Sequence, residues 1–200
     1  MNEIILITRA WNFAAARHSG QRRKGQAQEP YINHLSEVAE LVAFATAGSD
    51  ANLVAAAILH DTVEDTPTLS AELVKAFNED VASLVAEVTD DKNHLKRVRK
   101  RHQVVSAPGK SSRAKLLKLA DKTSNLRSLA KSPPTDWSVR RRREYLKWAL
   151  AVAAGLRGEN LWLEAQFDEA VKQSEQALGL AGTRRYPHRT HRTPDGRVKP

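Results

Sequence analysis

Apolar side chains recur along most of this chain with the spacing of α-helices. In residues 32–47 they return at intervals of three and four, which places them on one face of a helix, and the pattern stops near Gly48. Residues 51–61 are apolar nearly all round, as in a helix buried at the centre of a domain. Asp50 stands where an N-cap is expected. The pattern therefore predicts an amphipathic helix followed by a central, buried one.

The rest of the chain continues this periodicity. Residues 1–20 predict a first helix, although the segment from Ile4 to Thr8 alone fits either a helix or a strand. No period-two alternation is long enough to indicate a sheet, so we expect an all-α fold. Further helices are expected at residues 69–91 with a break near Asn78, at 93–104 as a charged, exposed helix, and at 112–130, 137–156 and 159–178, with loops at 66–68 and 107–109.

Length and composition suit one domain. With 200 residues and 41% hydrophobic content, the chain can bury a full core, and we assign residues 1–180 to a single helical domain. The absence of cysteine excludes disulfides and thiolate metal sites. No apolar stretch approaches the roughly 20 residues that span a bilayer, and the N-terminus lacks the features of a signal peptide. We expect a cytoplasmic protein without a membrane partner.

The positive charge is concentrated at the C-terminus. The formal net charge is +9, and the residues after Gly182 hold six basic side chains against Asp195, so they contribute +5 and leave +4 for the rest. We interpret residues 181–200 as a solvated, disordered basic tail. The alternative is a weak contact with nucleic acid or another polyanion, and we do not expect nucleic acid to be the partner that defines the function.

Four separated residues have side chains suited to one metal ion: His34, His60, Asp61 and Asp121. Each alone has an ordinary structural explanation: His34 as a satisfied helix residue, the His-Asp pair as coincidence, and Asp121 as a buried partner of a lysine. Their occurrence together on apolar helices favours a shared site. Imidazoles and carboxylates without thiolates suit a divalent ion such as Mn²⁺, so the sequence indicates a metal-assisted hydrolase.

Further polar residues beside these candidates suggest how the chemistry proceeds. Crowded carboxylates are costly to bury without a cation, and a divalent ion also lowers the pKa of a bound water from about 15.7 towards 7. Glu64 and Asp65 follow the His-Asp pair closely, so a carboxylate that is not a ligand can accept a proton from that water. Asn125, one helical turn after Asp121, can hold a phosphate or water by hydrogen bonding.

Two basic segments are candidates for binding phosphate. Residues 22–24, Arg-Arg-Lys, are either a solvated turn or a positive wall beside the metal site. Residues 140–143 are four consecutive arginines, of which about half should face solvent, because one helix face must point outward. In the turn that follows, we assign Trp148 to the core and leave Tyr145 open between core and substrate contact.

Taken together, five segments resemble a known family. They are GQRRK at 20–24, PYINH at 30–34, AILHDTVED at 57–65, EVTDDK at 87–92 and KLADKTSNLR at 118–127. Their order and length are similar to those of the HD-domain phosphohydrolases. Within that family they resemble the single-domain small alarmone hydrolases of the RelA/SpoT group, which include the metazoan SpoT homologue. The resemblance extends to about residue 178.

The resemblance implies a compact helical HD domain that removes the 3′-pyrophosphate of guanosine tetra- and pentaphosphate, giving pyrophosphate and GDP or GTP. It implies that Glu64 and Asp65 act on the attacking water and that Asn125 positions the substrate. The remaining implied roles are Mn²⁺ binding by His34, His60, Asp61 and Asp121, and substrate binding by Arg23, Lys24, Arg141 and Tyr145.

Several alternatives stay open. The chain is too short for the synthetase domain of the long bifunctional enzymes, so we expect hydrolysis only, and the basic tail has no counterpart in the family pattern. Another phosphorylated nucleotide, NADPH included, could be the substrate of the same metal site. A different class is a non-catalytic polyanion-binding module with a structural metal. The oligomeric state and the division of proton transfer between Glu64 and Asp65, which can titrate as a coupled pair, do not follow from the sequence.

Overall fold

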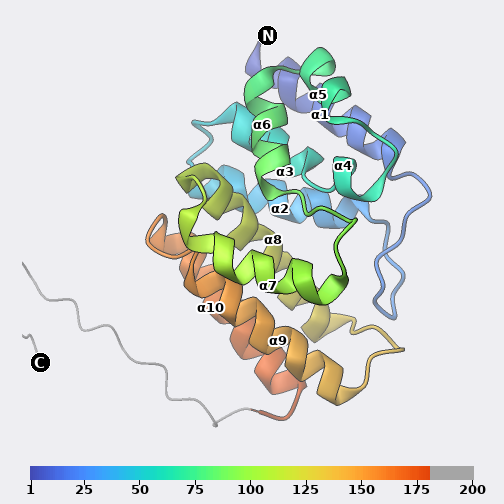
Figure 1. Ribbon diagram of the computed structural model, residues 1–200, viewed down its shortest axis with the longest axis vertical. Coiled ribbons are helices and arrows are strands. Elements are labelled where there is room, and N and C mark those ends of the chain that lie inside the picture. Colours follow the sequence, from blue (N-terminus) through green and yellow to red (C-terminus); the bar gives the residue numbers. More distant parts are fainter. Residues whose placement is uncertain (181–200) are drawn as a thin grey trace, which may run out of the picture.

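The computed structural model describes residues 1–180, and every regular element in this range is helical, as predicted (Figure 1). The predicted disorder of residues 181–200 lies outside the described residues. The elements are α1 (Glu3–Arg17), α2 (Ile32–Ala45), α3 (Ala51–Leu59), α4 (Thr62–Asp65), α5 (Ser70–Ala76), α6 (Glu79–Val88), α7 (Lys96–Ser106), the 3₁₀ turn η1 (Ala107–Gly109), α8 (Ser112–Lys131), α9 (Val139–Ala154) and α10 (Leu161–Ala177).

Side-chain caps begin several of these helices, and the cap at Asp50 is the one that the sequence predicted. The Asp50 carboxylate accepts a hydrogen bond from the Leu53 N–H at the start of α3. Asn78 accepts from Val81 N–H and so begins α6, which explains the predicted break between α5 and α6. Asn2 likewise caps α1, so the ambiguous segment near the N-terminus is helical.

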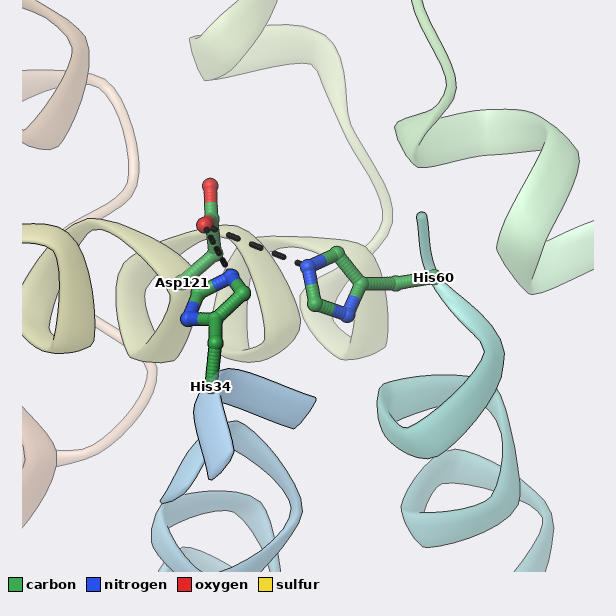
Figure 2. A group of neighbouring side chains, drawn as sticks. All are labelled: His34, His60 and Asp121. Carbon is green, nitrogen blue, oxygen red and sulfur yellow. Dashed lines mark ion pairs between the residues drawn. The ribbon is translucent and has the colours of Figure 1, made fainter. Parts of the chain in front are cut away.

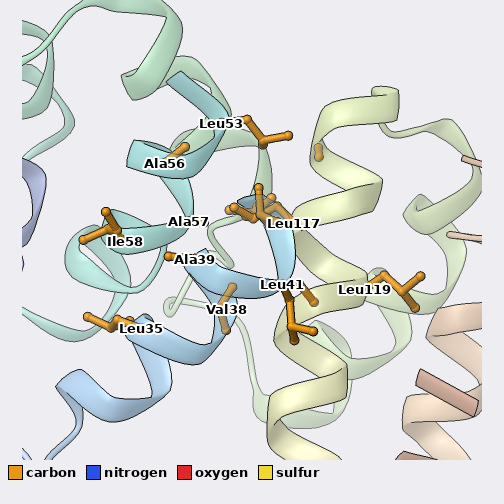
Figure 3. Packing of buried hydrophobic residues seen from close by; sticks show 14 of the residues in the cluster. Leu35, Val38, Ala39, Leu41, Leu53, Ala56, Ala57, Ile58, Leu117 and Leu119 are labelled. Carbon is orange, nitrogen blue, oxygen red and sulfur yellow. The ribbon is translucent and has the colours of Figure 1, made fainter. Parts of the chain in front are cut away.

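The core lies around α3 and α8. Helix α3 packs against α1, α2 and α6, whereas α8 packs most extensively on α10 and also contacts α2, α6 and α9. Figure 3 shows the apolar contacts where α2, α3 and α8 meet, with Leu35, Leu53 and Leu117 fully buried or nearly so. Each such side chain contributes about 1.5–3 kcal/mol on burial. The helices that carry or lead to the candidate ligands therefore pack through fully buried apolar side chains.

One connection differs from its prediction. Residues 107–109 were expected to be a loop, but they form the 3₁₀ turn η1, with Pro108 in its first turn and Ala107 fully buried. Proline pre-sets a helical φ angle, which favours this turn over an irregular loop. The short α4 was also not anticipated as a separate helix.

The basic loop before α2 is held against the α8–α9 connection. Isolated bridges join Arg22 to Pro30 and Gly25 to Pro134, and the Ala27 N–H donates to Ser132 Oγ at 2.8 Å. A Cβ atom on Gly25 would lie 2.2 Å from the Ser132 carbonyl oxygen, so only glycine permits this approach. The loop is thereby fixed beside α8.

None of the helices in residues 1–180 combines the length and apolar character needed to cross a bilayer.

Candidate metal centre and cleft

Three helices bring two imidazoles and a carboxylate together. His34 lies in the first turn of α2, His60 directly follows α3, and Asp121 lies in the middle of α8. Asp121 Oδ1 is 3.4 Å from His34 Nε2 and 3.9 Å from His60 Nε2 (Figure 2). One ligand atom from each residue lies within 4.8 Å of the others, and all three residues are buried.

Asp61 completes the predicted set of four. Its Oδ2 atom lies 3.1 Å from His60 Nε2 and 3.6 Å from His34 Nε2. The same oxygen accepts a hydrogen bond of 2.5 Å from the Tyr31 hydroxyl. The sequence did not single out Tyr31, although it lies in the 30–34 segment on which the family resemblance rests.

The orientation of the imidazoles fits a cation. His60 Nδ1 lies 2.8 Å from the Ala57 carbonyl oxygen, which can only accept, so Nδ1 carries the proton. His60 Nε2 is then left facing the cluster, buried and without a hydrogen-bond partner among the described residues. Nitrogen lone pairs and carboxylates converging in a buried space match the donors that a borderline divalent ion takes.

The charges of the cluster are strongly coupled. Burial lowers the pKa of His60, but Asp61 and Asp121 outweigh it and raise that pKa to about 9. Burial raises the pKa of Asp61, yet His60 and His34 bring it well below its usual range. The pKa of Asp121 is also lowered, because Lys122 and His34 outweigh the effect of burial. Both carboxylates are therefore ionised, as ligands must be, whereas a cation must displace the Nε2 proton that these carboxylates favour on His60 before that nitrogen can bind it.

Asp121 could also be explained as the buried partner of a lysine, and this explanation holds for one of its two oxygens. Lys122 Nζ lies 2.7 Å from Asp121 Oδ2, whereas Oδ1 faces the imidazoles and accepts a hydrogen bond from Asn125 Nδ2. Asn125 Oδ1 in turn accepts from Arg23 at 3.0 Å. The helix thus links the cluster to the basic loop through Asn125.

The two predicted acids have different surroundings. Glu64 is half-buried, lies 3.3 Å from Arg99 and accepts a hydrogen bond from the Asp90 N–H. Its pKa is raised, mainly by burial and to a smaller extent by the nearby negative charge of Asp61. Asp65 is exposed and pairs with Lys92 at 2.5 Å. Of these two acids, Glu64 is the one whose carboxylate is both near the charge of Asp61 and partly shielded from water.

A cleft of about 860 Å³ adjoins the cluster. Tyr31 and Asn125, which hydrogen-bond to candidate ligands, lie in its wall. Trp148, which the sequence assigns to the core, packs against the core but is only half-buried and also lines the cleft. The ammonium groups of Lys100 and Lys122 lie 4.6 and 4.8 Å from the centroid of its ring. All predicted substrate and acid residues line this cleft: Arg23, Lys24, Glu64, Asp65, Arg141 and Tyr145.

Helix α7 contributes to this cleft, which the sequence did not indicate. We interpreted this helix as exposed, and none of its residues is buried, but Lys96, Arg99 and Lys100 line the cleft. Burial and the neighbouring positive charge of Arg141 lower the pKa of Lys96. The pKa of Lys100 is lowered in the same way, mainly by burial and then by the positive charge of Lys96. Lys96, Arg99 and Lys100 are three and four residues apart, so they share one basic face of α7. Only the packing of α7 on α9 shows that this face meets the cleft.

Comparison with known proteins places these features in a family. A family model described as the HD domain matches residues 10–156. The chain is 47% identical over 167 residues to guanosine-3′,5′-bis(diphosphate) 3′-pyrophosphohydrolase MESH1 of Xenopus tropicalis, covering 84% of this chain and 93% of that protein. The MESH1 of Homo sapiens is 45% identical over 179 residues, which cover 90% of this chain and 98% of the human protein.

A solved structure shares the arrangement. It is described by the words "A metazoan ortholog of SpoT hydrolyzes ppGpp and plays a role in starvation responses". It superposes with a TM-score of 0.81 at 42% sequence identity and covers 88% of this chain and 96% of that one.

Proposed function

Because this chain belongs to the HD-domain family, we propose that residues 1–180 form a metal-dependent phosphohydrolase that removes the 3′-pyrophosphate from guanosine tetra- and pentaphosphate. The products are pyrophosphate and GDP or GTP. The observation that carries this proposal is the cluster of two imidazoles and two carboxylates beside a cationic cleft. The relatives named above carry the same activity in their names.

His34, His60, Asp61 and Asp121 are the proposed ligands, and Mn²⁺ is the proposed ion. Their donor atoms are nitrogen and oxygen only, which suits Mn²⁺ better than ions that prefer thiolates. When bound, such an ion lowers the pKa of a coordinated water and polarises a phosphoryl oxygen. Tyr31 donates to Asp61 Oδ2, the oxygen that faces the imidazoles, and Lys122 holds Asp121 Oδ2, which leaves Asp121 Oδ1 facing them. Both carboxylates are thus oriented in advance.

Glu64 is the proposed principal proton acceptor. Its half-buried carboxylate has a raised pKa, which brings it closer to the range in which a general base works best. Arg99 and the Asp90 N–H hold its two oxygens in place. Asp65, exposed and paired with Lys92, is better suited to orienting water or substrate at the rim.

The cations of the cleft are the proposed phosphate contacts. Arg23 and Lys24 come from the basic loop, Arg141 from α9, and Lys96 and Lys100 from α7, so a substrate with phosphates at both ends meets positive charge from several sides. Asn125 lies between Arg23 and Asp121 and would hold the scissile group near the metal. Tyr145 offers a ring in the same wall, and burial raises its pKa to about 12, which keeps its hydroxyl protonated.

We further propose that the domain hydrolyses without synthesising and that it acts in the cytoplasm. The proposed site draws residues from the basic loop, α2, the α3–α4 connection, α4, α7, α8 and α9, and the MESH1 relatives are matched along nearly their full length.

The test combines metal analysis with product measurement. Metal-stripped protein is assayed for pyrophosphate release from guanosine tetraphosphate with and without Mn²⁺, alongside NADPH and deoxynucleoside triphosphates. We expect Mn²⁺-dependent turnover that is highest with guanosine tetraphosphate. If the protein hydrolyses NADPH but not guanosine tetraphosphate, NADPH takes the place of the proposed substrate. Absence of metal binding would refute the metal site.

A further inference from the structure

The outer nitrogen of His34 lies against a polar chain between α2 and α8. His34 Nδ1 is 2.8 Å from Ser124 Oγ, and Ser124 Oγ is 2.6 Å from Glu37 Oε2. His34 and Glu37 stand three residues apart on α2, so they share a helix face, and Ser124 on α8 bridges them. Ser124 and the His34 side chain are almost completely shielded from solvent.

The chemistry of these groups fixes the direction of both hydrogen bonds. Arg127 pairs with Glu37 Oε1 at 3.0 Å, and its charge and the Ser124 bond lower the pKa of Glu37 against the opposing effect of burial. An ionised carboxylate only accepts, so the single Ser124 hydroxyl proton goes to Glu37. Ser124 Oγ must then accept from His34 Nδ1. The proton of the neutral imidazole is therefore on Nδ1, and the Nε2 lone pair faces the cluster.

His34 and His60 reach the same orientation by different means. His60 Nδ1 donates to a main-chain carbonyl, that of Ala57, which no substitution removes. His34 depends on side chains alone. Arg127, which pairs with Glu37, also donates to Gln166 on α10 at 2.8 Å, so the polar chain behind His34 continues to a third helix.

We propose that Ser124 and Glu37 are positioning residues that set the protonation and rotation of His34 for metal binding. This inference rests on the proposed function only in requiring a divalent ion at the cluster. Outer partners of metal-bound histidines typically change metal affinity by about 10- to 100-fold. Neither residue stands out in the sequence as a candidate for the site.

The experiment measures Mn²⁺ affinity directly. Metal-stripped full-length protein is titrated with Mn²⁺, and free Mn²⁺ is counted by electron paramagnetic resonance. Ser124→Ala removes the acceptor of His34 Nδ1, and we expect its Mn²⁺ Kd to rise by about 10- to 100-fold. The matched control is Ser174→Ala, because Ser174 is also fully buried and its hydroxyl bonds only to the Leu126 carbonyl among the described contacts. Its Kd should equal that of the wild type.

Glu37→Gln provides an independent arm at a partly exposed position. A glutamine amide can donate to Ser124 Oγ, which frees the hydroxyl to donate to His34 Nδ1 and places the imidazole proton on Nε2, where it opposes a metal. We expect weaker Mn²⁺ binding in this variant as well.

The outcomes separate this inference from the proposed function. Unchanged Mn²⁺ affinity in a folded Ser124→Ala protein, or an equal loss in Ser174→Ala, would overturn the positioning role. If Ser124→Ala does not fold, Glu37→Gln decides: weakened binding supports the inference and unchanged binding overturns it. A wild-type protein that binds no Mn²⁺ would instead refute the metal site itself, and the positioning role with it.

Discussion

Neighbouring side chains in this protein acquire different chemical roles from their surroundings. Glu64 and Asp65 are adjacent carboxylates, yet one is half-buried near Asp61 and the other is exposed beside Lys92. Asp121 similarly divides its two oxygens between Lys122 and the imidazoles. The environment of each atom, more than the residue type, determines whether it binds metal, moves a proton or holds another group in place.

Substitutions at Asp61 and Glu64 should separate metal binding from catalysis. We expect Asp61→Ala to abolish both Mn²⁺ binding and turnover, because it removes a ligand. Glu64→Gln should retain Mn²⁺ and lose about 10²- to 10⁴-fold in kcat, the usual contribution of a general base. Metal content and pyrophosphate release are measured on the same preparations.

Asp65→Asn is the comparison variant for this pair. Its kcat should fall less than that of Glu64→Gln, because Asp65 is exposed and held by a surface lysine. Full turnover in Glu64→Gln together with an inactive Asp65→Asn would assign the proton transfer to Asp65 instead.

Among the elements, one guanidinium joins three helix starts. Arg113, in the first turn of α8, donates from Nε and Nη2 to Asp50, the N-cap of α3, and from Nη1 and Nη2 to Asp80 in the first turn of α6. Helices α3 and α8 lead to His60 and Asp121. The arginine therefore ties together the far ends of the two helices on which the metal cluster depends.

Arg113→Met should lower stability without changing the site. Because the partners are partly exposed, we expect a loss of about 1 kcal/mol, which corresponds to about 2–4 °C in Tm for a chain of this size. Thermal unfolding measures the loss, with Lys172→Met, which breaks one exposed pair with Glu169, as the control expected to change little. A Tm equal to that of the wild type would show that the Arg113 pairs contribute nothing to stability.

For the whole molecule, the cleft is formed by segments far apart in the sequence. The basic loop, α7, α8 and α9 each supply part of its wall, and the metal cluster at its side depends on α2, α3 and α8. All of these segments lie within residues 1–180. We therefore propose that this range is the functional unit.

Removing residues 182–200 should leave turnover nearly intact. Every residue proposed to bind metal or substrate is retained in such a protein, so kcat and KM for guanosine tetraphosphate should stay close to those of the full chain. Steady-state kinetics of the two forms test this. Loss of activity on deletion would favour a function that depends on the basic segment.

Much of the site followed from local sequence. Apolar spacing places most helices, Asp50 and Asn78 mark helix starts, and the predicted ligands His34, His60, Asp61 and Asp121 do lie together. Their assignment as ligands remains a proposal. Period and capping are local properties, which is why they can be read without knowing the fold.

The sequence by itself determined the helical class, the approximate helix boundaries and the residue types available for metal chemistry, because these depend on neighbours along the chain. Tertiary structure decided which faces meet: that α7 turns Lys96 and Lys100 to the cleft, that Trp148 lies in its wall, and that Ser124 joins His34 to Glu37. The contact between His34 and Ser124 alone joins residues 90 positions apart. These relations arise only when the helices pack, since packing sets burial, hydrogen-bond direction and the field around each charge.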